Sequence, residues 1–92
     1  MPARKALPPQ NCPPGKEYVF RKPNGQEVGK ARNVKEFVEL LKRAPLESVT
    51  YHANNAHFSP WLTFMGMQSA AQSARAIKGT SEDVRKRLIA LF

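Results

Sequence analysis

The clearest hydrophobic pattern in the chain has helical spacing and lies in residues 33–45. Its apolar positions are three or four residues apart and share one helix face: Val34, Phe37, Val38 and Leu41. Asn33 suits the N-cap position, and Glu36 stands three residues later, as in a capping box. Because proline cannot continue a helix, we expect the helix to end before Pro45.

Shorter segments favour extended strands. Residues 16–22 (KEYVFRK) place Tyr, Val and Phe side by side, a composition typical of strands. The following Asn24-Gly25 pair predicts a two-residue hairpin turn, because both residue types tolerate positive φ. We therefore expect residues 26–31 to return as a second strand. Residues 48–53 (SVTYHA) have a similar composition and predict a further strand.

The C-terminal part of the chain predicts three short helices. Ser59 as cap and Pro60 in the first turn suit the start of the first helix, and Gly66 suits its end. The second helix should end at Gly79, and Thr80 should cap the third. The expected apolar face of the second comprises Met67, Ala70, Ala71, Ala74 and Ile77. That of the third comprises Val84, Leu88 and Leu91. The predicted fold class is α+β, a small antiparallel sheet with helices packed on one side.

Composition divides the chain into an arm and one domain. Five of the eight prolines lie in residues 1–15, where they favour a flexible, proline-rich arm. Residues 16–92 are long enough for a single domain with a modest core, and the chain is 41% hydrophobic. The sequence holds no run of about 20 apolar residues and no signal-peptide pattern. We therefore expect a soluble, cytoplasmic protein with no membrane partner.

Charge is unevenly distributed. Fifteen Lys and Arg residues against seven Asp and Glu residues give a net charge of +8. Residues 44–74 contain no Lys or Arg and a single acid, Glu47, although they hold Tyr51, Phe58, Trp61 and Phe64. An uncharged aromatic segment is therefore flanked by two basic segments. In so small a domain this charge predicts a polyanionic partner, nucleic acid in the first place.

Patterns typical of catalysis are missing from the sequence. There is no P-loop, no Gly-x-Gly-x-x-Gly turn and no Gly-x-Ser-x-Gly elbow. The single cysteine, Cys12, lies in the arm, and with His52 and His57 it forms no recognised metal-ligand spacing. A hydrolase based on His52 stays open, but no nucleophile can be paired with it. We expect a protein that is not an enzyme and that has no metal and no cofactor.

Aromatic and basic residues together suit single-stranded nucleic acid, because cations neutralise phosphates and flat side chains stack on exposed bases. The expected phosphate ligands are Arg21, Lys22, Lys30 and Arg32. The expected base contacts are Tyr18, Phe20, Tyr51, His52, Phe58 and Trp61. Each aromatic ring can instead be buried in the hydrophobic core. We expect this for Phe37 and favour it for Phe20 and Phe64. We expect Arg85, Lys86 and Arg87 to form a solvated face, and Trp61→Ala to weaken binding without unfolding the domain.

A family resemblance points the same way. The run from Tyr51 to Leu62 (YHANNAHFSPWL), with Tyr51-His52 and Phe58-x-x-Trp61 as its landmarks, resembles the ThermoDBP and ThermoDBP-related proteins, which bind single-stranded DNA in hyperthermophilic archaea. The likeness extends over residues 16–79, mainly in the order of elements. It implies an antiparallel sheet with helices, a cleft that mixes apolar rings with basic side chains, and a homo-oligomer. Larger members carry a C-terminal zipper extension, whereas this sequence stops at Phe92.

Three hypotheses of function follow. The favoured one is a binder of single-stranded DNA, and of RNA as a further partner, with low sequence specificity. The alternative is a protein-interaction or assembly module that docks a partner through residues 44–74. Duplex binding is the third, and it is less attractive because no predicted helix concentrates basic and amide side chains as a recognition helix does.

Overall fold

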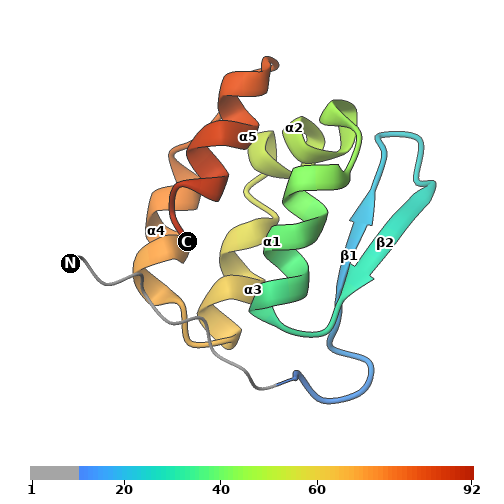
Figure 1. Cartoon of the computed structure of the whole chain (residues 1–92), viewed down its shortest axis with the longest axis vertical. Helices are drawn as coiled ribbons and strands as arrows, with labels where there is room; N and C mark the ends of the chain where they lie inside the picture. Colours follow the sequence, from blue (N-terminus) through green and yellow to red (C-terminus); the bar gives the residue numbers. More distant parts are fainter. Residues whose placement is uncertain (1–10) are drawn as a thin grey trace.

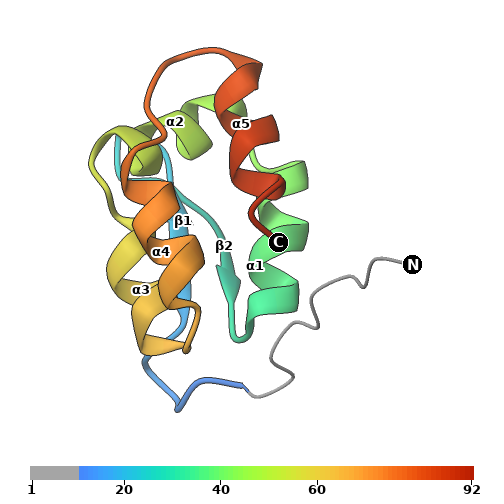
Figure 2. The same ribbon diagram turned by 90° about the vertical axis from the view of Figure 1, so that its left-hand side faces the viewer.

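The computed structural model describes residues 11–92 and has an α+β fold, as predicted. Strands β1 (Tyr18–Arg21) and β2 (Glu27–Ala31) form a two-stranded antiparallel sheet. Five helices follow in the described chain: α1 (Val34–Arg43), α2 (Leu46–Asn54), α3 (Phe58–Phe64), α4 (Gln68–Arg75) and α5 (Glu82–Ile89). All of them lie on one side of the sheet (Figures 1 and 2).

The hairpin between β1 and β2 has the predicted strands but a different turn. Gly25 donates its N–H to the Lys22 carbonyl, and Lys22 donates to the Gln26 carbonyl. Gly25 has φ +90°, while Asn24 does not adopt a positive φ. The connection is therefore a three-residue loop that needs one left-handed residue, and the predicted two-residue turn, which needs two, is wrong. The pairing also shifts between Phe20 and Arg21, so that Val28 forms a β-bulge.

Helix α1 has the predicted boundaries because its signals are local. The Asn33 side chain accepts a hydrogen bond from the Glu36 N–H at 2.8 Å, and the helix ends at Arg43, before Pro45. The whole predicted stripe is buried. The Glu36 carboxylate completes no reciprocal capping box, since it accepts from the backbone N–H and guanidinium of Arg32 instead.

The predicted strand over residues 48–53 is wrong, because this segment belongs to helix α2. Its β-branched and aromatic residues favour strands only weakly, and tertiary packing overrides such preferences. Four of the five buried residues of the helix recur at helical spacing: Ser48, Val49, His52 and Ala53. Two of these polar side chains, Ser48 and His52, reach the backbone of β1.

The last three helices exist as predicted, with shifted ends. Helix α3 begins at Phe58, so Ser59 and Pro60 lie in its first turn and Ser59 is not the cap. Helix α4 ends at Arg75, four residues before Gly79. Ser81, and not Thr80, caps α5, since its hydroxyl accepts from the Asp83 N–H at 3.3 Å. None of the helices in residues 11–92 combines the length and the apolar character needed to cross a membrane.

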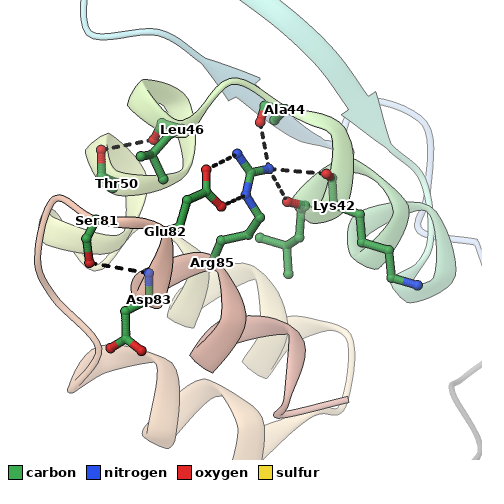
Figure 3. A network of polar contacts seen from close by, with 9 residues as sticks. Lys42, Ala44, Leu46, Thr50, Ser81, Glu82, Asp83 and Arg85 are labelled. Carbon is green, nitrogen blue, oxygen red and sulfur yellow. Dashed lines mark hydrogen bonds and ion pairs between the residues drawn. The ribbon is translucent and has the colours of Figure 1, made fainter.

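Arg85 is not part of a solvated face. Its guanidinium reaches from α5 to the C-terminal end of α1, where it donates to the carbonyls of Leu41, Lys42 and Ala44 at 2.8, 3.2 and 2.7 Å (Figure 3). It also pairs with Glu82 at 2.8 Å. These carbonyls have no partner within their own helix, so Arg85 caps α1 from another element. The expectation of an outward side chain is correct for Lys86 and Arg87, which are exposed.

The start of the described chain is tied to the fold. The Cys12 N–H donates to the Arg32 carbonyl at 2.7 Å, and Asn33 donates to the Asn11 side chain at 2.8 Å. Residues 11 and 12, which the sequence assigns to the arm, thus lie beside the N-terminal end of α1. The remainder of the arm, residues 1–10, falls outside the described residues.

Candidate nucleic-acid interface

Most of the rings expected to stack on bases are inside the protein. Phe58 and Trp61 are 1% and 8% exposed, and Tyr18 and Phe20 are buried with them. A base can stack only on an accessible ring face, so these four rings offer no stacking surface. Phe64, which the sequence favours as a core residue, is 54% exposed. Four rings predicted to be accessible are therefore buried, and one ring predicted to be buried is exposed.

The buried rings form one cluster around Tyr18. Its centroid lies 5.1 to 5.8 Å from those of the surrounding aromatic residues: Phe20, Phe37, His52, Phe58 and Trp61. The Trp61 indole N–H donates to the Lys16 carbonyl at 2.8 Å, so the polar group of this ring is satisfied internally. Trp61 is therefore a core residue, and we expect Trp61→Ala to destabilise the fold, contrary to the sequence-based expectation.

Tyr18 carries the one buried side-chain polar atom in residues 11–92 that has no hydrogen-bond partner, its hydroxyl oxygen. Burial, followed by the nearby Tyr51, raises the pKa of the Tyr18 phenol well above its ordinary value. Tyr18 therefore stays neutral, and it acts in the cluster as a flat, largely apolar ring.

His52 joins this cluster to the sheet. It is 5% exposed, and its Nε2 accepts the backbone N–H of Arg21 at 2.8 Å. Because Nε2 is an acceptor, the proton of neutral His52 lies on Nδ1, which is 3.0 Å from Nδ1 of His57. Burial, together with the neighbouring His57, lowers the pKa of His52 to about 4. His52 is thus a neutral structural residue, and its burial excludes direct contact with a base.

The turn after α2 places His57 over His52. The His57 N–H donates to the His52 carbonyl, and the Ala56 N–H donates to the Ala53 carbonyl, a Schellman motif. Ala56 fills the left-handed position of this motif with φ 55°, where glycine is usual. The corresponding position after α3 is Gly66, with φ +86°. The turn thereby presents His57 at the surface beside the buried His52.

Tyr51 is the one proposed stacking ring that is not buried. It is half-buried, and its centroid lies 5.1 Å from that of His52 and 5.3 Å from that of the exposed His57. The backbone of Arg21 is bonded to the same His52, and the exposed Arg21 side chain donates to the Gly25 carbonyl at 3.2 Å. Tyr51 and His57 thus lie side by side, and His52 links them to the backbone of Arg21; we call these three residues the Arg21–Tyr51–His57 site.

The other three predicted phosphate ligands, Lys22, Lys30 and Arg32, do not form one basic surface with Arg21. Lys22 lies at the base of the hairpin loop, and Lys30 lies opposite Val19 on the outer face of the sheet. Arg32 forms an ion pair with Glu36 at 2.9 Å. Hydrogen bonds from backbone amides lower the pKa of Glu17, and the charges of Lys30 and Arg32 contribute. This end of the sheet therefore mixes acids with its cations.

Most cations of the described chain are nevertheless free. The ion pairs within residues 11–92 use Arg32, Arg85 and Arg87. The exposed cations without an ion pair in that range are Lys16, Arg21, Lys30, Lys35, Lys42, Arg43, Arg75, Lys78 and Lys86. They are distributed over the hairpin and several helices, so the positive potential covers much of the molecule.

A groove of about 510 Å³ runs between β2 and α1. Its lining comprises Val28, Gly29, Lys30, Arg32, Glu36, Glu39, Leu40 and Arg43. Three cations and two acids leave it nearly balanced in charge, so it is a poor channel for phosphates alone. Within residues 11–92, no three His, Cys, Asp or Glu side chains converge as metal ligands would.

Comparison with known proteins gives no assignment. No protein-family model matches the chain, and neither a curated protein nor a solved structure shows significant similarity to it.

Proposed function

We propose that the protein binds single-stranded nucleic acid, DNA or RNA, with little sequence preference and mainly through its phosphates. The observation that supports this most is the large excess of exposed cations that have no ion pair within the described chain. Cations that are neutralised by acidic side chains contribute little to binding a polyanion, whereas free cations neutralise its phosphates and release their counterions. On this proposal the protein acts in the cytoplasm, associated with the nucleoid.

The Arg21–Tyr51–His57 site would supply the contact to an unpaired base. The Arg21 guanidinium would hold a phosphate, and the exposed part of the Tyr51 ring would stack on a neighbouring base. One half-buried ring contributes less than a row of exposed rings. Affinity on this proposal therefore depends more on charge than the sequence alone suggests.

Salt dependence tests the electrostatic part of the proposal. Binding is measured by fluorescence anisotropy of labelled single-stranded DNA, single-stranded RNA and duplex DNA over a range of salt concentrations. We expect log K for the single strands to fall linearly with log salt, with a slope of about 0.7 per neutralised phosphate. Intrinsic tryptophan emission should change little, because Trp61 is buried. Affinity that does not depend on salt, or no binding at low salt, would overturn the proposal.

Two variants test the site. Tyr51→Ala should weaken single-strand binding about fivefold, near the lower limit for loss of a stacked base, and Tyr51→Phe should retain it. Arg21→Ala should lower the salt slope by about 0.7. Lys78→Ala removes the same charge away from the hairpin and serves as the matched control. Equal effects of Arg21→Ala and Lys78→Ala, with none from Tyr51→Ala, would exclude the Arg21–Tyr51–His57 site.

Phe64 supports a second candidate function, a protein-interaction module acting through residues 44–74. It is the exposed large hydrophobic residue of the described chain, and the half-buried Met65 and Met67 follow it. An exposed ring of this size next to half-buried apolar side chains offers an apolar surface to which a partner protein could bind. Phe64→Ala distinguishes the two functions: it should leave nucleic-acid affinity unchanged under the first and abolish partner capture under the second.

A further inference from the structure

The two outer edges of the sheet differ in what faces them. Along β1, side chains of helix α2 bond to the outward backbone groups of Arg21. His52 Nε2 accepts the Arg21 N–H, and the Ser48 hydroxyl donates to the Arg21 carbonyl at 2.9 Å. Along β2, the described chain provides no further strand, since the sheet consists of β1 and β2 alone (Figure 1). The edge of β2 is therefore the open one.

The pairing shows which backbone groups this open edge presents. In an antiparallel pair, successive residues direct their N–H and C=O groups to alternate sides of the strand. The backbone N–H of Arg21 points away from β2, whereas the backbone N–H of Lys22 points towards it and donates to the Gln26 carbonyl. Glu27 and Lys30, the cross-strand partners of Arg21 and Val19, must then direct their own N–H and C=O groups outward.

These two residues make the edge self-complementary. Because Arg21 and Val19 are two residues apart on β1, their partners Glu27 and Lys30 carry their side chains on the same outer face of the sheet. They lie on either side of a midpoint between Val28 and Gly29. A two-fold axis through that midpoint would place Glu27 of each copy directly opposite Lys30 of the other, with both backbones in hydrogen-bonding register.

The groove beside β2 leaves room for this pairing. It extends along the strand to Glu39, Leu40 and Arg43 of α1. A Cβ on Gly29 would lie 2.9 Å from Leu40, so the Leu40 side chain closes the inner side of the strand at the midpoint. An added strand would meet an apolar floor there and opposite charges at its two ends. The Arg21–Tyr51–His57 site lies on the other edge and would stay accessible.

We propose that two copies of this chain associate through their β2 edges to form a continuous four-stranded antiparallel sheet, with Glu27 of each copy opposite Lys30 of the other. Strand addition of this kind is a general mode of recognition at open sheet edges. Self-association depends on β2 and not on nucleic acid, so it is independent of the proposed function.

Charge exchange tests the proposal directly. Sedimentation velocity of the full chain, without nucleic acid, is recorded over a range of concentrations from micromolar upward. We expect the wild type to dimerise with rising concentration. Lys30→Glu and Glu27→Lys should each weaken dimerisation roughly tenfold or more, because each creates two like-charge pairs across the axis. The double variant, which restores opposite charges and the original net charge, should recover it.

Lys78→Glu is the matched control, since it makes the same change in net charge on an exposed residue away from the sheet. It should dimerise as the wild type does, and circular dichroism should show that every variant is folded. A wild type that stays monomeric throughout would overturn the proposal. So would a dimer that is indifferent to Lys30→Glu, or a double variant that does not recover.

Discussion

The two edges of the sheet show how one hairpin can serve both the core and the surface. The β1 edge is closed by Ser48 and His52 of α2, and its inward rings Tyr18 and Phe20 are buried among other aromatic residues. The β2 edge is open, bears Glu27 and Lys30, and borders a groove. The two edges thus differ because Ser48 and His52 of α2 bond to the backbone of β1, whereas the sheet of the described chain ends at β2.

Because the two edges differ in this way, substitutions at them should affect different properties of the protein. Changes on the β1 side should affect the free energy of unfolding, whereas exposed positions and the β2 side should affect association and leave that free energy nearly unchanged.

The largest effect is expected from Trp61→Ala. It removes a buried ring and the hydrogen bond to Lys16, so the free energy of unfolding should fall by about 3–5 kcal/mol. Chemical denaturation measures it. Phe64→Ala, which removes an exposed ring from the same helix, should change stability by less than about 0.5 kcal/mol. Similar losses from both variants would contradict the division between buried and exposed rings.

A smaller effect should follow from acidification. His52 has a pKa of about 4 in the folded protein against an ordinary value of 6.5, so between these pH values the unfolded chain binds a proton that the folded protein does not. Stability from this group is complete above pH 6.5 and is lost as the pH falls towards 4, by about 3 kcal/mol in total.

Denaturation at a series of pH values measures this loss. His52→Gln keeps an acceptor for the Arg21 N–H but cannot titrate, so its stability should be flatter over the same range. An equally steep pH dependence in the variant would show that other groups cause the loss.

The smallest effect concerns the sheet edges themselves. Ser48→Ala removes the hydrogen bond to the Arg21 carbonyl and should cost about 1 kcal/mol of unfolding free energy. Lys30→Ala, on the open edge, should cost close to nothing in a dilute sample. Thermal or chemical unfolding of the two variants compares the edges, and equal costs would remove the contrast between them.

The boundaries and the buried face of helix α1 were predictable from the sequence, because their signals are local. The cap at Asn33, the apolar stripe and the stop at Pro45 act within one segment, whatever the rest of the chain does. The two strands of the hairpin were predictable for the same reason. The turn between them was not, since Asn24-Gly25 permits two left-handed residues and the structure uses one.

The candidate site was predictable only in part. The sequence indicates Arg21 and Tyr51 as ligands of nucleic acid, but it also includes Tyr18, Phe20, Phe58 and Trp61, which the fold buries. Composition cannot separate a stacking ring from a core ring, because both need the same flat apolar surface. His57 was missed as a site residue. Its five-residue spacing from His52 is the signal that could have indicated it, once residues 48–53 are known to be helical.

The sequence by itself determined the α+β class, the helix from Val34 to Arg43 and the excess of positive charge, since each depends on local pattern or on counting. Tertiary structure decided the helical state of residues 48–53, the burial of the rings around Tyr18 and the capping role of Arg85. These depend on partners 31 to 44 residues away along the chain, as between His52 and Arg21 or between Arg85 and Leu41. Burial is a property of the assembled elements, so no pattern within one segment can report it.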